Sequence, residues 1–487
     1  MAEGGAADGR AGTGVGGLDE VLNGGLLRDR LYLVEGTPGA GKTTLAMQFL
    51  IEGARRGEKG LYLTLAETAD ELRAFAASHA WELPANLDIH ELLSPDNLLD
   101  DGQQQSLLYS SDLELGETTQ RVFDAVERSR PRRIVLDSLS EIRLLAQHSL
   151  RYRRQVLALK HYFTRHGATV MLLDDMTAEA GDRTVHSIAH AVLRLEELTP
   201  GYGAERRRLR VVKYRASAYR GGFHDFRLAH GGVTVFPRLR SVEHRAPVER
   251  RPLASGVAAL DALLGGGIDR GTSALLLGPA GTGKSTLSLL FAAAAVARGE
   301  RAAVFVFDEE LGLLMERSKG LGLDMAAMIA TGRFFVEQID AAELSPGEFT
   351  HRVRACIDAH AVKTVVIDSL NGYQESMPEE QFLVLHMHEL LQYLNRRGAT
   401  TFLTVAQHGL VGDMKSPVDV TYLADSVILL RYFEALGHVR RAISVLKKRS
   451  GAHEDTIREY RITSRGIRPA CWRCCQWKAT RSRAPGT

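Results

Sequence analysis

The chain has 487 residues, about three times the length of a typical domain, which favours two or more domains and excludes an isolated binding module. With 45% hydrophobic and 25% charged residues its composition is that of a globular protein and excludes a chain that is disordered throughout. The net charge of +2 gives no argument for a nucleic-acid or membrane partner.

The cysteine content and the N-terminus indicate a cytoplasmic, reducing setting. Four cysteines in so long a chain cannot form a disulfide framework, and the opening MAEGGAADGR lacks the basic and apolar regions of a secretory signal. The most apolar helical stretch, residues 287–297, is about half of the roughly 20 residues that a membrane-spanning helix needs. We therefore expect a flexible segment at residues 1–12 and no membrane partner.

The chain repeats itself. The segment that begins TGVGGLDEVL at Thr13 aligns without gaps, at an offset of 242, with SGVAALDALL at Ser255. A later block aligns Asp137 of IVLDSL with Asp368 of VVIDSL at an offset of 231. The difference of 11 residues falls in the polar stretch 94–116, which we interpret as a surface loop without a chemical role.

Two domains follow from this repeat, at residues 13–241 and 255–468, with a Pro- and charge-rich linker at 242–254. Short apolar segments alternate with longer helical patterns, as expected of an α/β domain whose mainly parallel sheet is covered by helices on both faces. In the second half these segments lie at 274–278, 303–307, 364–368 and 401–405.

Each half carries a phosphate-binding loop, GTPGAGKT in the first and GPAGTGKS in the second. Both satisfy GxxxxGK[ST] between an apolar strand and a helix, where glycines let backbone N–H groups surround phosphate oxygens and the lysine neutralises their charge. ATP or a close analogue is the expected ligand, and a chance Gly-rich turn is the alternative. The residues are Gly36, Thr37, Pro38, Gly39, Ala40, Gly41, Lys42, Thr43 and Thr44, and Gly278, Pro279, Ala280, Gly281, Thr282, Gly283, Lys284, Ser285 and Thr286.

Acidic residues at strand ends complete each expected site. Asp137 and Asp368 end buried strands and, with the hydroxyls of Thr43 and Ser285, are candidate ligands for Mg²⁺; the alternative is that each caps a turn. Hydrolysis also needs a group that orients or deprotonates water. At the 242 offset Glu67 aligns with Glu309 and Ala66 aligns with Asp308. The second half therefore has an acidic pair where the first has a single acid.

These features together resemble the KaiC family of RecA-superfamily ATPases over roughly residues 12–468. The resemblance implies two tandem RecA-like P-loop domains and a hexameric double ring with ATP between subunits. It also implies that a Lys-x-Arg pair on a late strand reaches the nucleotide of the neighbouring subunit and stabilises charge there. The matching pairs are Lys213 with Arg215, and Lys447 with Arg449; without the resemblance they would be solvated strand ends.

The resemblance further implies that Asp308 and Glu309 serve as base for water attack and for phosphorylation of a hydroxyl on the adjoining subunit. Where clock proteins have an adjacent Ser and Thr, this chain has Thr421 and Tyr422, so Thr421 is the one candidate phosphosite and dual phosphorylation is not expected. The alternative is that Thr421 packs or caps a turn. Ala66 predicts a first site that is slow or chiefly structural.

The C-terminal segment, 469–487, departs from the family. It holds three of the four cysteines, Cys471, Cys474 and Cys475, but lacks a second pair of zinc ligands. We expect a disordered basic tail, with a partner or redox role as the alternative.

Three functions remain open from the sequence. The first is a ring ATPase that phosphorylates itself or acts on a signalling partner. The second is a nucleotide-gated scaffold with little turnover, in which bound ATP stabilises the assembly. The third, a DNA-dependent ATPase, depends on basic stretches such as ERRRLR at residues 205–210, and a nucleic-acid partner is the least favoured of the three.

Overall fold

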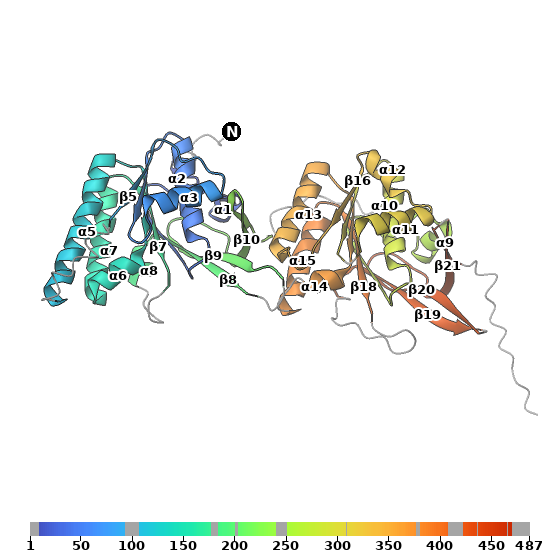
Figure 1. The fold of residues 1–487 in the computed structure, drawn as a ribbon. Helices are drawn as coiled ribbons and strands as arrows, with labels where there is room; N and C mark the ends of the chain where they lie inside the picture. The colour runs from blue at the N-terminus through green and yellow to red at the C-terminus, as the bar shows by residue number, and fades with distance from the viewer. Residues whose placement is uncertain are drawn as a thin grey trace, which may run out of the picture. The chain divides into compact units, whose positions relative to one another are not determined.

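The computed structural model describes residues 9–92, 107–176, 184–199, 203–239, 251–307, 309–375, 380–407, 422–435, 437–464 and 466–469. The chain divides into two compact units, residues 1–238 and 239–487, and each is built around its own sheet (Figure 1).

The first unit has a nine-stranded sheet in the order β11-β10-β9-β8-β3-β7-β6-β4-β5. Strands β8, β3, β7, β6, β4 and β5 run parallel, and β9, β10 and β11 continue the sheet as antiparallel strands. The strands are β1 (Arg10–Ala11), β2 (Leu26–Leu27), β3 (Leu31–Gly36), β4 (Gly60–Thr64), β5 (Leu87–Glu91), β6 (Arg133–Asp137), β7 (Thr169–Asp174), β8 (Ala191–Leu198), β9 (Arg206–Tyr214), β10 (Phe223–Ala229) and β11 (Gly232–Phe236). The helices are α1 (Leu18–Val21), α2 (Lys42–Arg55), α3 (Ala69–Ser78), α5 (Leu107–Ser129), α6 (Leu139–Ala146), α7 (Ser149–Arg165) and α8 (Thr184–Ile188).

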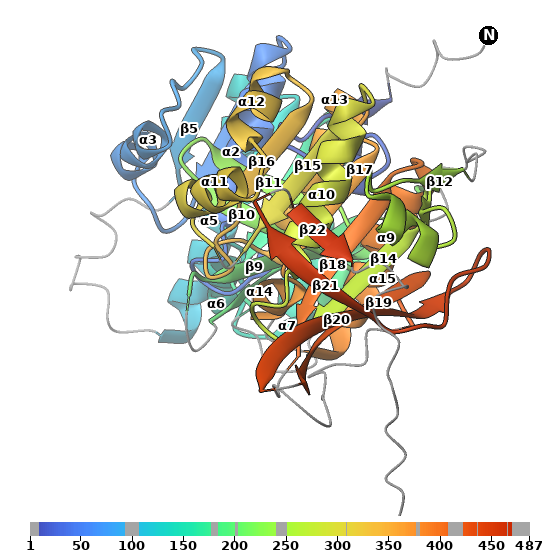
Figure 2. The ribbon, with the colours of Figure 1, turned by 90° about the vertical axis from the view of Figure 1, so that its right-hand side faces the viewer.

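The second unit repeats this topology in the order β16-β15-β17-β18-β14-β19-β20-β21-β22, with six parallel strands and then three antiparallel ones. The long β19–β20 pair and the strands that follow it are visible in Figure 2. The strands are β12 (Pro252–Leu253), β13 (Ile268–Asp269), β14 (Ser273–Gly278), β15 (Ala302–Val306), β16 (Phe334–Gln338), β17 (Thr364–Asp368), β18 (Thr400–Ala406), β19 (Ser426–Ala435), β20 (His438–Lys448), β21 (Arg458–Thr463) and β22 (Gly466–Pro469). The helices are α9 (Ala258–Leu263), α10 (Lys284–Ala297), α11 (Leu311–Gly320), α12 (Met325–Ala330), α13 (Pro346–His360), α14 (Leu370–Glu375) and α15 (Glu380–Arg396).

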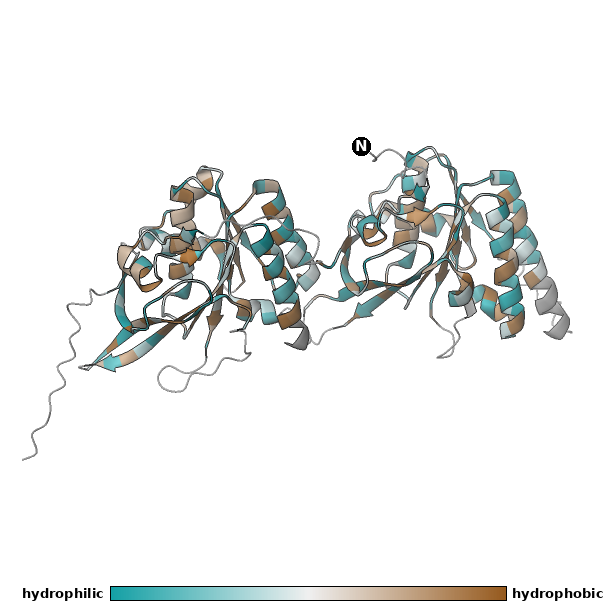
Figure 3. Ribbon diagram, turned by 180° about the vertical axis from the view of Figure 1, so that it is seen from behind, coloured by the Kyte–Doolittle hydropathy of each residue, from teal (hydrophilic) through white to brown (hydrophobic). Residues whose placement is uncertain are grey.

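Each sheet is buried on both faces. In the first unit one hydrophobic core joins the sheet to α1 and α2, and a second joins the opposite face to α5, α6 and α7. The second unit has the same two cores, one against α9, α10 and α11 and one against α13 and α15. Figure 3 shows the apolar strands between helices whose outer faces are polar. The predicted fold, two tandem RecA-like α/β domains, is thus confirmed.

The structure differs from the sequence-based boundaries in three places. Residues 107–116, expected in a surface loop, belong to α5, which at 23 residues is longer than its 15-residue counterpart α13; part of the extra length therefore extends a helix. Residues 10–11, expected in the flexible N-terminus, form β1 and pair with β2. Residues 252–253, expected in the linker, form β12 and pair with β13.

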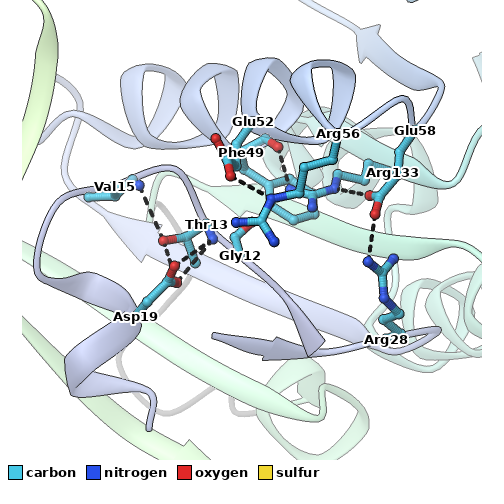
Figure 4. Close-up of polar contacts among 10 residues, drawn as sticks. All are labelled: Gly12, Thr13, Val15, Asp19, Arg28, Phe49, Glu52, Arg56, Glu58 and Arg133. Atoms are coloured by element: carbon cyan, nitrogen blue, oxygen red, sulfur yellow. Dashed lines mark hydrogen bonds and ion pairs between the residues drawn. The ribbon is translucent and has the colours of Figure 1, made fainter. Parts of the chain in front are cut away.

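A buried arginine at the start of β6 fixes the phosphate-binding helix α2 against the sheet in the first unit (Figure 4). Arg133 is fully buried, pairs with Glu58 at 2.5 Å and donates to the carbonyl oxygens of Gly12 and Phe49 at 2.7 and 2.8 Å. Its guanidinium lies 4.6 Å from the ring centroid of Phe49. Because β6 carries Asp137 at its other end, this cluster helps to place the candidate metal ligand relative to α2.

Candidate functional site

The first phosphate loop connects β3 to α2. Gly41 precedes the helix with φ 93°, a left-handed conformation that glycine adopts without the steric cost that a Cβ brings. The ammonium of Lys42 folds back over the loop and donates to the carbonyl oxygens of Gly36 and Thr37 at 2.9 and 3.0 Å. The N–H groups of the first turn of α2 and this buried lysine are the groups that a phosphate-binding site requires.

The second phosphate loop has the same geometry between β14 and α10. Gly283 precedes α10 with φ 94°, and Lys284 Nζ donates to the carbonyl oxygens of Gly278 and Pro279 at 2.8 and 3.0 Å. Burial lowers the pKa of Lys284, while the charge of Asp368 opposes this shift. A buried cation in this position is suited to a phosphate counterion.

Asp137 and Asp368 lie at the ends of β6 and β17, beside the helix hydroxyls predicted as their partners. Thr43 Oγ1 is 3.3 Å from Asp137 Oδ2, and Ser285 is hydrogen-bonded to Asp368. Burial raises the pKa of both carboxyl groups, although hydrogen bonds, first among them those from Tyr62 to Asp137 and from Ser285 to Asp368, act in the opposite direction. A desolvated carboxylate beside a hydroxyl is a donor set that fits a hard cation such as Mg²⁺.

The two candidate general bases occupy matching positions directly after β4 and β15. Glu67 precedes Thr68, which caps α3, and Glu309 precedes Glu310, which caps α11. Partial desolvation raises the pKa of Glu67, and the charges of Asp137, Glu71 and Asp175 raise it further. We find no cationic partner for its carboxylate among the described residues.

The carboxylate of Glu309 is held differently. Arg317 on α11 donates to both of its oxygens, at 2.9 and 2.7 Å. At the 242 offset Arg317 corresponds to Phe75, whose ring packs against His79 and Trp81 instead. No sequence pattern singled out Arg317, because an arginine on a helix surface is ordinarily solvated.

The Lys-x-Arg pairs lie at the sheet edge where the parallel strands begin, which is opposite to the edge where the strands end and the phosphate loop follows. Because β9 is antiparallel to its neighbour β8, the backbone N–H of Arg215 bonds to His190 O and that of His190 bonds to Leu31 O, at the start of β3. The phosphate loop begins at the other end of β3, at Gly36, about 16 Å further along the strand. The guanidinium of Arg215 donates to Ser187 O at 2.8 Å.

The second unit repeats this arrangement. The N–H of Arg449 bonds to Asp425 O, and that of Asp425 to the carbonyl of Ser273, the first residue of β14, whereas Gly278 ends that strand. Arg449 also donates to Tyr422 O at 3.1 Å. The lysines point to nearby carbonyl oxygens as well: Lys213 bonds to that of His186, and Lys447 to that of Ala424 at 2.9 Å.

The basic stretch at residues 205–210 is largely neutralised by acids. Arg208 pairs with Glu196 at 2.8 Å and Arg207 with Glu205 at 2.6 Å, and the guanidinium groups of Arg208 and Arg210 lie 4.0 and 5.2 Å from the ring centroid of Phe223. This pattern is that of a salt-bridged strand surface. It weakens the argument for a DNA-phosphate contact there.

Comparison with known proteins identifies the family. The family model described as "ATPase: KaiC" matches the chain twice, over residues 11–240 and 253–469. The chain belongs to the KaiC family. The circadian clock protein KaiC3 of Synechocystis sp. is 27% identical over 460 residues, which cover 93% of this chain and 90% of that protein. The circadian clock oscillator protein KaiC of Synechococcus elongatus is 27% identical over 464 residues, covering 93% of this chain and 88% of that protein.

Family membership confirms the predicted resemblance and makes this chain an ATP-binding protein with two KaiC-type ATPase domains. None of the helices in the described ranges is long and apolar enough to cross a membrane. Asp308, Thr421 and the cysteines of the C-terminal segment lie outside the described residues.

Asp175 was not singled out from the sequence, although it lies at the first phosphate loop. Its carboxylate Oδ1 is 2.7 Å from Lys42 Nζ. The 231 offset, which aligns the RHGAT and RRGAT segments, aligns Asp175 with Ala406. An acid in one half where the other half has alanine was the sequence signal that could have singled out Asp175.

Proposed function

We propose that this KaiC-family protein hydrolyses ATP at two kinds of site, each completed by a neighbouring copy of the chain. The observation that carries this proposal is the position of Arg215 and Arg449 at the sheet edge opposite to their own phosphate loops. An arginine so placed supports transition-state charge only at another subunit's nucleotide, which requires a closed assembly such as the hexameric ring implied by the family resemblance.

In this proposal the two phosphate loops bind the triphosphate through their N–H groups and through Lys42 and Lys284. Thr43 with Asp137, and Ser285 with Asp368, would hold Mg²⁺, which when bound neutralises charge on the β- and γ-phosphates. Lys213 and Lys447 accompany the two arginines at the neighbouring site.

Glu67 and Glu309 orient or deprotonate the attacking water. The raised pKa of Glu67 brings its proton affinity nearer to that needed in a general base. In the second unit the corresponding carboxylate, that of Glu309, accepts two hydrogen bonds from Arg317. The two sites are therefore expected to turn over at different rates.

The test is Mg²⁺-dependent phosphate release by the full chain and by Lys42→Ala and Lys284→Ala variants, each leaving one kind of site intact. Turnover that falls in each single variant and disappears in the double variant supports the proposal. ATP binding without turnover in the unmodified chain would favour a nucleotide-gated scaffold, and it would overturn the catalytic roles.

Phosphopeptide mass spectrometry on the same samples tests the autokinase expected from the family. Phosphate on Thr421 that disappears with Lys284→Ala would assign that activity to the second unit. Strong stimulation of turnover by DNA, weakening steeply with salt, would instead support the DNA-dependent ATPase.

A further inference from the structure

The two phosphate-loop lysines differ in one contact. Lys42 and Lys284 donate to equivalent loop carbonyls, but only Lys42 has an acidic partner among the described residues, the carboxylate of Asp175 at 2.7 Å. The Lys42 side chain is 7% exposed and that of Asp175 is 32% exposed. The ion pair therefore lies at the mouth of the phosphate loop, with the lysine buried and the acid facing outward.

Asp175 is held in this place by the turn that follows Asp137. The hydroxyls of Ser138 and Ser140 each lie 3.4 Å from Asp175 Oδ2, and the backbone N–H of Asp175 donates to Ser140 Oγ at 3.3 Å. These contacts occupy one carboxylate oxygen and leave the other, Oδ1, on the lysine. The acid is consequently positioned by its neighbours and not only by attraction to Lys42.

The second unit holds the same backbone without the acid. Ala406 is the last residue of β18, whereas Asp175 directly follows β7, and the N–H of Ala406 donates to the side-chain oxygen of Asn371 at 2.7 Å. Asn371 corresponds to Ser140 at the 231 offset. The chain path is thus fixed in both units, and the presence of a carboxylate beside the lysine is what distinguishes them.

We propose that Asp175 is a resident anion of the first phosphate loop, which the terminal phosphates of ATP must displace from Lys42. This inference rests on the proposed function, since it assumes that the first loop binds ATP. The phosphate-loop lysine contacts the β- and γ-phosphates, so a carboxylate on its ammonium competes for the same hydrogens. Once ATP is bound, the displaced carboxylate of Asp175 repels the phosphates, because both are negatively charged. The charge of Asp175 also acts on the neighbouring carboxyl groups of Glu67 and Asp137.

A consequence is that the first site binds ATP more weakly than its loop sequence alone would allow. The second site lacks this competition and should fill at lower ATP concentration. The first unit would then respond to changes in ATP concentration over a range in which the second unit is already saturated.

The experiment is equilibrium binding of a fluorescent ATP analogue with Mg²⁺ to the full chain carrying Lys284→Ala, which leaves the first site as the binding site measured. Asp175→Ala, which installs the residue of the second unit, and Asp175→Asn, which keeps a side chain of the same shape, are each added to that background. Both are expected to tighten binding at least about fivefold. Asp88→Asn is the charge control, because it also removes one negative charge from the first unit. Asp88 pairs with Lys59 at 3.1 Å near the start of β5, away from the phosphate loop.

The reciprocal variant, Ala406→Asp in a Lys42→Ala chain, should weaken binding at the second site. Unchanged or weaker binding in both Asp175 variants would overturn the resident-anion proposal while leaving the ATP site itself intact. So would equal tightening by Asp88→Asn, because a general charge effect would then explain the result. If neither the Lys284→Ala chain nor its Asp175 variants bind the analogue, the first site is not an ATP site and the proposed function fails with it.

Discussion

Arg317 donates to both carboxylate oxygens of Glu309, at 2.9 and 2.7 Å, while the corresponding residue of the first unit, Phe75, leaves Glu67 without that contact. These two charge-assisted hydrogen bonds occupy both carboxylate oxygens of Glu309 and hold them against α11. The same reaction is therefore prepared differently in the two units.

Replacement of Arg317 by alanine should release Glu309 and increase turnover at the second site about threefold or more. The measurement is phosphate release in a Lys42→Ala chain, with Glu309→Gln as the reference for lost catalysis. If Arg317→Ala slows turnover as much as Glu309→Gln does, Arg317 positions the base and does not restrain it.

The raised pKa of Glu67 predicts the acid limb of the first site's activity. A base must be deprotonated, so turnover of a Lys284→Ala chain should fall as pH drops through the raised pKa of Glu67, at a pH above the ordinary glutamate value of 4.5. Glu71→Gln removes one of the charges that raise the pKa of Glu67 and should therefore move the midpoint to lower pH. The variant should keep the cap of α3, because glutamine also serves at the third position of a capping box. A midpoint that does not respond to Glu71→Gln would contradict the assignment of Glu67 as base.

The buried Asp137 predicts opposite effects on stability and on function. Its pKa is raised, so the folded chain binds the proton more tightly than the unfolded chain does, and ligand-free stability falls as pH rises through that raised pKa. Asp137→Asn should remove this penalty and raise the melting temperature without nucleotide by about 2 °C. The same variant should lose most of the stabilisation that ATP with Mg²⁺ gives to a Lys284→Ala chain. Thermal denaturation with and without ligand measures both effects, and a variant that is less stable but still responds to ligand would argue against a metal-holding role.

Gly53 and Arg133 should be energetically coupled. A Cβ added at Gly53 would lie 2.3 Å from Arg133 Cδ, whereas the second unit has Ala295 and Thr364 at these places. Gly53→Ala alone should destabilise the first unit by about 2 kcal/mol, but by less than about 0.5 kcal/mol when Arg133→Thr is also present.

Urea denaturation followed by the fluorescence of Trp81 measures this coupling, because the other two tryptophans, Trp472 and Trp477, can be replaced by phenylalanine in the C-terminal segment. Trp81 packs against the core of the first unit. Additive effects of the two substitutions would show that the close contact is relieved elsewhere.

The sequence predicted what depends on local pattern. The GxxxxGK[ST] loops, the strand-ending Asp137 and Asp368, and the repeat itself could be identified because spacing and hydrophobic periodicity determine them. The end of the 94–116 stretch was predicted wrongly, because its polar residues lie in the first turns of a long amphipathic helix, α5, and not in a loop.

Features that depend on tertiary placement could not be obtained in this way. The antiparallel direction of β9 carries Arg215 to the sheet edge away from Gly36, and this depends on strand pairing. The contact of Asp175 with Lys42 joins residues 133 positions apart, and only the alignment of Asp175 with Ala406 hinted at a difference. The pairing of Arg317 with Glu309 likewise depends on how α11 leaves its strand.

Complementation between two inactive chains tests the central claim most directly. One chain carries Lys42→Ala and retains Arg215, the other carries Arg215→Ala and retains Lys42, and both carry Lys284→Ala so that only first sites contribute. If each first site is completed by a neighbouring copy, the separate chains should release almost no phosphate, and a mixture assembled together should regain a substantial fraction of first-site turnover. A mixture as inactive as its components, although the two chains co-assemble, would contradict the account, because Arg215 would then not act on the ATP of its neighbour.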